Sequence, residues 1–359
     1  QKIFCPYREH LGQRHMKYSF IIPVKAINDY IREAIPEILK IARNDYEIIV
    51  YPDSVGAQLI APLPPDDRRG AINRAPTRQI GTGAMGPAEK RSLAIRDAKG
   101  EILIFIDDDA YPEKNFLDIL AKDFEDESVV AVGGPAITPK NDSFWQKVSG
   151  AFFVSALSGG YPERYVSKGK KRLVDDWPSV NLSVRKKSFE EIGGFNSSYW
   201  PGEDTKLCLD LLAKGGKIIY DPELVAYHHR RAGLLKHLRQ VGGYGIHRGF
   251  FAKKYPQTSL KFKYFLPSFF LLFNILFLID LVAYFLYPSI FDLVTGIFLL
   301  GYGLYFLALC VAFFDIYRYE RNFLISLCAL PYIFFSHLYY GWRFIQGFVF
   351  TKELKSKLR

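Results

Sequence analysis

Cysteine is scarce in this sequence, with four residues among 359, and the four lack the spacing of a metal site. Two of them, Cys310 and Cys328, lie in long apolar stretches, so the pattern argues against a disulfide framework and favours a reducing, cytosolic setting. Residues 1–17 also lack the apolar core of a signal peptide. We therefore expect a polar N-terminal extension over 1–17, followed by a domain that stays in the cytosol.

Acidic residues are absent between His228 and Lys263, a window that holds nine lysines and arginines. It therefore carries +9 of the net charge of +10. Apolar side chains recur among these charges at helical spacing: Leu234, Leu235, Leu238 and Val241. This pattern predicts a basic amphipathic interface segment over 228–263 that lies on anionic lipid headgroups. Nucleic acid is the alternative partner for such a charge, but the apolar segments that follow favour lipid, and we expect no nucleic acid.

Long apolar runs are absent before Tyr264 and dominate after it. Three segments are long enough to cross the hydrocarbon core, which takes roughly 20 residues: 264–287, 290–314 and 323–350. The sequence thus predicts a multi-pass protein of the cytoplasmic (inner) membrane with its soluble domain, 18–227, in the cytosol. Asp280 within the first segment indicates either a functional group or a hydrogen bond between helices.

The topology of the third apolar segment stays open. It contains Pro331 and several polar residues, so it could cross with a polar face packed inward or lie partly in the interface. Three crossings would leave the basic tail, 351–359, outside, against the positive-inside rule.

In the soluble part, short apolar runs rich in β-branched residues alternate with helical stretches from Ser19 to Pro135. The runs are 19–24, 47–51, 102–106 and 129–132. This alternation predicts an α/β, doubly wound domain built on a parallel sheet.

Three carboxylates, Asp107, Asp108 and Asp109, directly follow the run 102–106. Ligands of open α/β sheets bind at the carboxyl ends of strands. Three repelling acids there favour a hard cation, Mg²⁺ or Mn²⁺, shared with phosphate oxygens. The alternative is a solvated acidic turn that caps a helix starting near Pro112.

Two further charged pairs stand at predicted helix starts. Lys90 and Arg91 follow a glycine-rich turn and oppose the helix dipole, which favours anion binding over a plain turn. Glu203 and Asp204 by themselves fit an ordinary acidic helix start.

Taken in chain order, these motifs resemble the inverting family-2 glycosyltransferases with a GT-A fold. The similarity runs from about Tyr18 to Arg248 and overturns the helix-start interpretation of the second acid pair. The matching segments are Phe20–Val24, Asp53, Gly86–Arg91, Phe105–Asp109, Asn181, Gly193–Phe195 and Gly202–Asp204.

This resemblance implies roles for particular residues. Asp53 would contact the nucleotide base, Asp107 would face the nucleotide sugar, and Asp109 would ligate Mg²⁺ or Mn²⁺. Asp204 would be the catalytic base. The remaining donor-side residues are Pro23, Lys90, Arg91 and Asp108, and the acceptor-side residues are Asn181, Trp200 and Glu203.

One departure from the family concerns processivity. Processive synthases carry Q-x-x-R-W, whereas Gln240 is followed by Val-Gly-Gly-Tyr, which favours transfer of a single sugar. The sequence predicts a metal-dependent inverting hexosyltransferase that moves a sugar, UDP-linked by preference, to a lipid-linked acceptor in cell-envelope glycan assembly. A polyprenyl-phosphate sugar synthase, a nucleotidyltransferase and a non-catalytic membrane scaffold stay open as alternatives.

Overall fold

The structure, a computed structural model, describes residues 17–55, 75–196, 199, 201–286 and 288–354. The predicted N-terminal extension, Trp200 and most of the basic tail lie outside the described residues.

The soluble domain is built on an eight-stranded sheet of order β3-β2-β1-β4-β9-β6-β10-β8. Its strands are β1 (Tyr18–Pro23), β2 (Tyr46–Tyr51), β3 (Thr77–Gln79), β4 (Ile102–Ile106), β6 (Val129–Gly133), β8 (Arg172–Leu173), β9 (Asn181–Arg185) and β10 (Lys217–Tyr220).

The prediction of a parallel sheet was wrong for the centre of this sheet. β9 lies antiparallel between β4 and β6, and its first residue, Asn181, pairs with Ile106 at the end of β4. A buried apolar run has the same composition in either direction, so the reversal cannot be read from the residues of β9. The reversal brings the chain before β9 to the edge where β4 ends.

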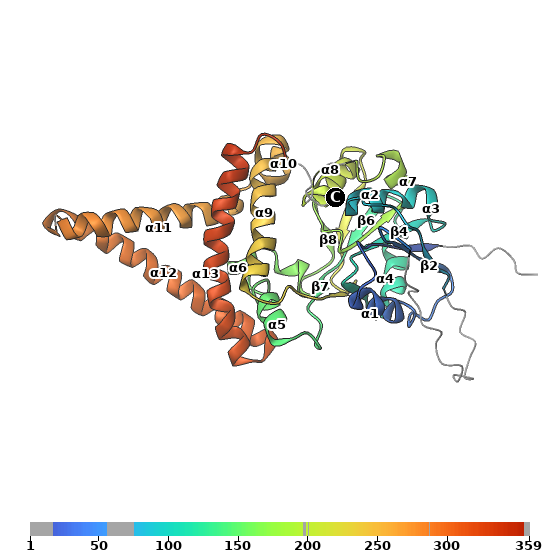
Figure 1. The fold of residues 1–359 in the computed structure, drawn as a ribbon, viewed down its shortest axis with the longest axis horizontal. Helices are drawn as coiled ribbons and strands as arrows, with labels where there is room; N and C mark the ends of the chain where they lie inside the picture. Colours follow the sequence, from blue (N-terminus) through green and yellow to red (C-terminus); the bar gives the residue numbers. More distant parts are fainter. Residues whose placement is uncertain (1–16, 56–74, 197–198, 200, 287, 355–359) are drawn as a thin grey trace, which may run out of the picture.

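Helices cover both faces of the sheet, as expected for a doubly wound domain (Figure 1). Alternate strand residues serve opposite faces, because successive side chains of a strand point to opposite sides. Ile104 packs with α1 and α4, while Phe105 packs with α7 and α8. The helices are α1 (Asp29–Ile38), α2 (Pro87–Ser92), α3 (Ala94–Asp97), α4 (Phe116–Asp123), α7 (Lys186–Glu191) and α8 (Glu203–Ala213).

A small second sheet corrects the predicted helix start near Pro112. Residues Ala110–Pro112 form β5, and the helix begins later, at Phe116. β5 pairs antiparallel with β11 (Ala226–His228), which also pairs with β7 (Ala136–Ile137). The pairing supplies hydrogen-bond partners to backbone that would otherwise be buried without them.

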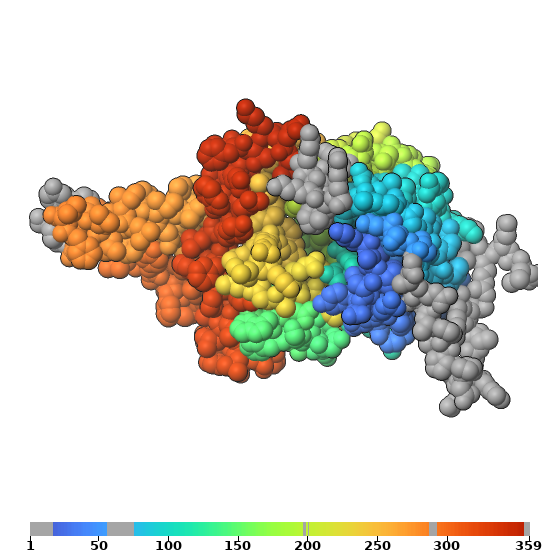
Figure 2. Space-filling view, in the orientation of Figure 1, coloured from blue at the N-terminus to red at the C-terminus, as the bar shows by residue number. Residues whose placement is uncertain are grey.

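The C-terminal third is helical and lies on one side of the soluble domain (Figure 1). α9 lies between that domain and α13, while α11 and α12 project away as a hairpin (Figures 1 and 2). Three helical segments are long and apolar enough to cross a membrane: 262–286, 293–320 and 323–350. The helices are α5 (Phe144–Ala151), α6 (Ala156–Gly159), α9 (Leu234–Lys254), α10 (Pro256–Ser259), α11 (Phe262–Leu286), α12 (Pro288–Glu320) and α13 (Phe323–Ile345); a short 3₁₀ turn, η1 (Pro162–Arg164), follows α6, and a π-helical turn, η2 (Gln346–Phe350), follows α13.

The basic window contains the predicted helix, α9, but its charges are not all on the surface. Arg230 and Arg248 are buried and bound to protein groups, Arg248 by an ion pair with Asp176. Within the hairpin, Thr295 of α12 donates a hydrogen bond to Asp280 of α11 at 2.7 Å. This bond supports the interpretation of Asp280 as a link between helices.

Candidate active site

The acidic triplet stands where β4 ends, in the tight connection to β5. The amide of Ala110 donates to the Asp107 carbonyl at 3.2 Å, and the amide of His229 donates to the Asp109 carbonyl at 3.0 Å. The backbone is therefore held on both sides, and the three carboxylates leave it in different directions.

Two of the three carboxylates meet a histidine. In the β5–β11 pairing His228 lies opposite Ala110, which brings its ring to Asp109, with Nε2 at 3.1 Å from Oδ1. Ligand atoms of Asp107, Asp109 and His228 all lie within 4.8 Å of one another. Two carboxylates and an imidazole form a set of metal ligands that suits Mn²⁺ and also accommodates Mg²⁺. The residues present thus fit the divalent cation expected from the sequence.

Asp109 and Asp108 have different electrostatic surroundings. Burial raises the pKa of Asp109, but the neighbouring His228, and then Arg231, outweigh it and hold the pKa at about 2. Asp108 turns away from the cluster and accepts a hydrogen bond from Asn28, the N-cap of α1, at 2.5 Å. Burial, with the negative Asp109 beside it, raises the pKa of Asp108 to about 6. Asp109 therefore stays ionised over the whole physiological range.

Lys90 and Arg91 both lie buried and face carboxylates. Lys90 forms an ion pair with Asp53 and donates to the carbonyl of Val24, next to Pro23 at the end of β1. This contact fixes Asp53 beside the ends of β1 and β2.

Arg91 connects the two halves of the site. Its Nη2 lies 2.5 Å from Oδ1 of Asp107, and its Nη1 lies 3.4 Å from Oε1 of Glu203. The Arg91 and Glu203 side chains are 3% and 7% exposed, so their contact is shielded from water, whereas Asp107 is 33% exposed. The guanidinium thereby ties the acidic triplet to the start of α8.

The start of α8 is shaped by Gly202. Its φ of +123° is a conformation that other residues rarely adopt, and a Cβ there would lie 2.5 Å from the His247 ring of α9. Glu203 and Asp204 follow it directly. The N-terminal end of α8 therefore packs directly against α9.

The two acids of α8 have different surroundings. Asp204 accepts from the amide of Thr205 at 2.8 Å and from the amide of Ser179 at 3.4 Å. Burial, and then the negative Asp176, raise its pKa. Burial, and then the charge of Asp204, raise the pKa of Glu203 to about 8. Burial thus favours the neutral form of Glu203, and the closeness of the two acids disfavours two negative charges at once.

Asn181, expected on the acceptor side, is fully buried. Its Nδ2 donates to the carbonyls of Pro135 and Leu224, at 3.0 and 2.8 Å. The side chain thus joins the loops after β6 and before β11 underneath the site.

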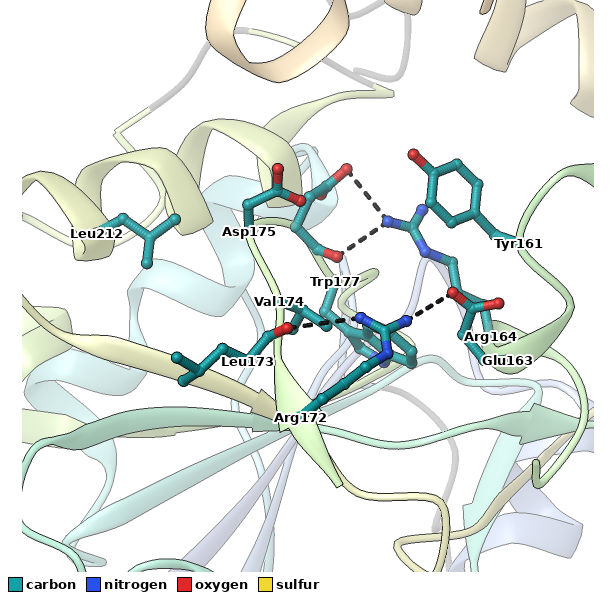
Figure 3. A pocket seen from close by; sticks show the side chains of 10 residues that line it. Tyr161, Glu163, Arg164, Arg172, Leu173, Val174, Asp175, Trp177 and Leu212 are labelled. Carbon is teal, nitrogen blue, oxygen red and sulfur yellow. Dashed lines mark hydrogen bonds and ion pairs between the residues drawn. The ribbon is translucent and has the colours of Figure 1, made fainter. Parts of the chain in front are cut away.

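A cavity of about 470 Å³ lies between α8 and the segment that contains Tyr161 and Arg164 (Figure 3). Arg164 and Tyr161 stand on one wall, with Asp175 and Leu212 across from them (Figure 3). Asp176 on its wall accepts a hydrogen bond from Thr205, the residue after Asp204, at 3.1 Å. Burial raises the pKa of Asp176, but the guanidinium groups of Arg248 and Arg164 outweigh it and lower the pKa below the usual range.

Sequence reasoning missed His228, Arg231 and Asn28 as members of the site. Arg231 lies 3.6 Å from Oδ2 of Asp109, and 54% of its side chain is exposed. In the sequence, His228 and Arg231 appear only as the beginning of the basic window. The pairing of β5 with β11 brings both to the acidic triplet. The adjacent His229 points elsewhere, to Asp142 at 2.5 Å.

Curated relatives and a solved structure resemble this chain. It is 24% identical over 69% of its length to a pre-mycofactocin glycosyltransferase of Mycobacterium tuberculosis. It is 25% identical over 45% of its length to a dolichyl N-acetyl-α-D-glucosaminyl phosphate 3-β-D-2,3-diacetamido-2,3-dideoxy-β-D-glucuronosyltransferase of Methanococcus voltae. In each case the match covers 50% of the relative, so the chain spans about half the length of both.

Among solved structures, a mannosyltransferase of Pyrobaculum calidifontis, determined with GDP-Man and Mn²⁺, has the same fold. The TM-score is 0.51 over 94% of this chain and 88% of the other, at 17% identity. The α/β domain is thus a GT-A domain followed by apolar helices, as the sequence predicted. The model of glycosyl transferase family group 2 matches residues 102–339, from β4 into α13, and this chain belongs to that family.

Proposed function

We propose that this protein is a membrane-bound, inverting glycosyltransferase that moves one sugar from a nucleotide-diphosphate donor to a lipid-linked acceptor. One arrangement carries the proposal: the possible metal ligands Asp107, Asp109 and His228 stand on one side, and the acids Glu203, which is buried, and Asp204, which is half-buried, stand on the other. Arg91 contacts both sides.

The donor would bind at the end of β4. Asp107, Asp109 and His228 would hold Mn²⁺ or Mg²⁺, which when bound supplies positive charge against the diphosphate. Arg231, half-exposed beside Asp109, is free on its outer side to contact the same diphosphate. Asp53, held by Lys90, would accept hydrogen bonds from the nucleotide base.

The acceptor would be activated by Asp204. Its carboxylate takes the proton of the acceptor hydroxyl as that oxygen forms a bond to the anomeric carbon. The bond from this carbon to the nucleoside diphosphate breaks on the opposite face, so the configuration inverts. Burial favours the neutral form of Glu203, and a neutral Glu203 would leave Asp204 as the acid of the pair that accepts this proton.

A lipid-linked acceptor is supported by the apolar helices beside the site and by the dolichyl phosphate in the name of the Methanococcus voltae relative. The absence of Q-x-x-R-W supports transfer of one sugar rather than synthesis of a polymer. We place the protein in the cytoplasmic membrane with its catalytic domain in the cytosol. Basic side chains exposed on and after α9 would meet anionic headgroups: Lys236, Arg239, Lys253, Lys254 and Lys263.

The full chain in detergent tests this proposal. It should transfer sugar from a panel of UDP- and GDP-sugars to a polyprenyl-diphosphate glycan, with Mn²⁺ present, and NMR of the product should show an inverted anomeric carbon. Transfer to polyprenyl phosphate alone would indicate a polyprenyl-phosphate sugar synthase. Titration calorimetry with UDP, with and without Mn²⁺, tests the alternative of a non-catalytic scaffold. Absence of UDP binding in both titrations would contradict the proposal. Transfer of a nucleotidyl group from a nucleoside triphosphate, with release of free diphosphate, would indicate a nucleotidyltransferase instead.

A further inference from the structure

The three apolar helices differ in how they are exposed. On α11 and α12 exposed apolar side chains cover more than half of the circumference, the remaining side being packed between the two helices, and only 6% of the most apolar window of each is buried. For the segment Phe323–Phe350 the share is 33%. There the exposed residues recur every three, four or seven positions along a single stripe: Leu324, Leu327, Pro331, Phe335, Tyr339, Trp342 and Val349. A helix with apolar side chains exposed over most of its circumference suits a bilayer interior, whereas a narrower apolar stripe suits a surface.

The opposite face of α13 is held by the soluble side of the molecule along its whole length. In its middle, Ser336 lies 3.1 Å from Nε2 of His237 on α9, whose Nδ1 lies 2.8 Å from Ser149 on α5. His337 follows with a contact of 3.3 Å to the carbonyl of Ser158. At the C-terminal end Lys253 of α9 donates to the carbonyl of Thr351 at 2.9 Å.

Glycines make this contact close. A Cβ on Gly245 would lie 2.8 Å from the carbonyl oxygen of Tyr340, and one on Gly249 would lie 2.1 Å from that of Phe344. On the α13 side, a Cβ on Gly347 would lie 2.1 Å from the carbonyl oxygen of Ile246. The two helices therefore run side by side with their backbones in contact (Figure 1), so α13 cannot leave the leaflet that α9 adjoins.

Both ends of the α11–α12 hairpin also adjoin the soluble domain. Near the start of α11, Lys261 pairs with Asp175 at 2.5 Å. Near the end of α12, Asp315 accepts from Ser155 at 2.9 Å. The chain then turns sharply into α13 at Arg321, whose φ is +53°. The hairpin thus leaves the soluble side and returns to it (Figure 2).

The charges agree with this path. No lysine or arginine occurs from Tyr264 to Tyr317, which includes the far tip of the hairpin. Basic residues flank both ends of the hairpin on the soluble side, at Lys263 and at Arg318, and Arg343 of α13 donates to the carbonyl of Gly242 on α9. Positive charges therefore gather on one side only.

We propose that only α11 and α12 cross the bilayer, and that α13 lies in the plane of the leaflet nearest the catalytic domain. Its apolar stripe occupies the boundary between headgroups and acyl chains, with Trp342 and Tyr339 among the residues that this boundary favours. Two crossings return the chain to its starting side, so Lys352 shares the compartment of the catalytic domain. The conflict that three crossings would create with the positive-inside rule disappears.

Single-cysteine labelling tests this topology on the full chain. Cys5, Cys310 and Cys328 are replaced by alanine, and the fully buried Cys208 stays as an unreactive control. A membrane-impermeant maleimide is added to sealed inside-out and right-side-out vesicles of the expression host. Lys352→Cys should be labelled in the same vesicles as the catalytic-domain reference Lys170→Cys, and Leu286→Cys only in the opposite ones. Labelling of Lys352→Cys together with Leu286→Cys would overturn the proposal.

Spin-label depth gives an independent measurement. Nitroxides at Leu327, Phe335 and Val349 should report one shallow depth from oxygen and nickel collision rates. The same labels at Leu266 and Ile275 of α11 should report a depth that increases towards the bilayer centre. A deep Phe335 between shallow neighbours would contradict the in-plane position. Release of the whole protein by alkaline carbonate would instead refute the proposed membrane location, so the two failures are distinguishable.

Discussion

Replacing Asp204 by asparagine removes the carboxylate that we assign as the base and keeps its size. In the wild-type protein Oδ1 accepts from Thr205 at 2.8 Å and Oδ2 accepts from Ser179 at 3.4 Å. The amide oxygen of asparagine can keep the shorter of these bonds, and the longer one is lost. Loss of one such bond costs about 1 kcal/mol, and removal of a buried charge offsets part of it. We expect the melting temperature to change by only a few degrees.

The catalytic loss should be much larger than the structural one. A general base contributes about 10²–10⁴-fold in rate, which corresponds to about 3–5 kcal/mol of transition-state stabilisation. Donor binding should be unchanged, because Asp53, Asp107 and Asp109 lie on the other side of Arg91. The expected result is a fall in kcat with an unaltered Kd for UDP.

The pH dependence separates a base from a structural residue. Because burial raises the pKa of Asp204, the wild-type rate should rise with pH through a value above the usual aspartate range. The asparagine variant should lose this acid limb. Asp210→Asn, on the same helix and paired only with Lys206, is the matched control and should leave rate and profile unchanged. Glu203→Gln should retain most of the activity, because burial and the charge of Asp204 favour the neutral form of Glu203. Near-normal turnover of Asp204→Asn together with inactive Glu203→Gln would refute the assignment.

Three further predictions concern the surroundings of this base. Asp109→Asn and His228→Ala should each weaken UDP binding in calorimetry with Mn²⁺ present and leave the weaker metal-free binding unchanged; an equal loss without metal would remove both from the ligand set. Gly202→Ala should lower the stability by about 1–3 kcal/mol, because its φ of +123° is strained for alanine and its Cβ meets His247; a variant as stable as wild type in thermal unfolding would contradict this geometry. Arg248→Met should destabilise the protein by about 3–5 kcal/mol, since it leaves a buried carboxylate short of its partner; an unchanged urea midpoint would show that Arg164 suffices as the partner of that carboxylate.

Much of the fold was predictable because it depends on local patterns. The run Ile102–Ile106 forms the strand β4, and the three acids stand at its carboxyl end. Because β1 runs parallel to β4, the end of β1 lies at the same edge of the sheet. The long apolar segments form the expected helices. Apolar runs and helical periodicity predict these elements because they show which side chains are buried away from water in the folded protein.

Three features could not be derived from such patterns. The direction of β9, the approach of His228 to Asp109 and the link from Arg91 to Glu203 all join residues far apart in the chain. Residue composition is the same whichever partner a strand or charged side chain finds. Which partner each one finds depends on the fold that gives every buried backbone polar group a hydrogen bond and every buried charge a partner.

The sequence by itself determined the family and its two groups of acids, one directly after β4 and one in the first turn of α8. It also determined which C-terminal segments are long and apolar. Only the tertiary structure decided which histidine completes the cluster, and which faces of α9 and α13 are buried against each other. The physical reason is that hydrophobicity fixes which segments leave water, while close packing of backbones, as at Gly249, fixes which of their faces meet.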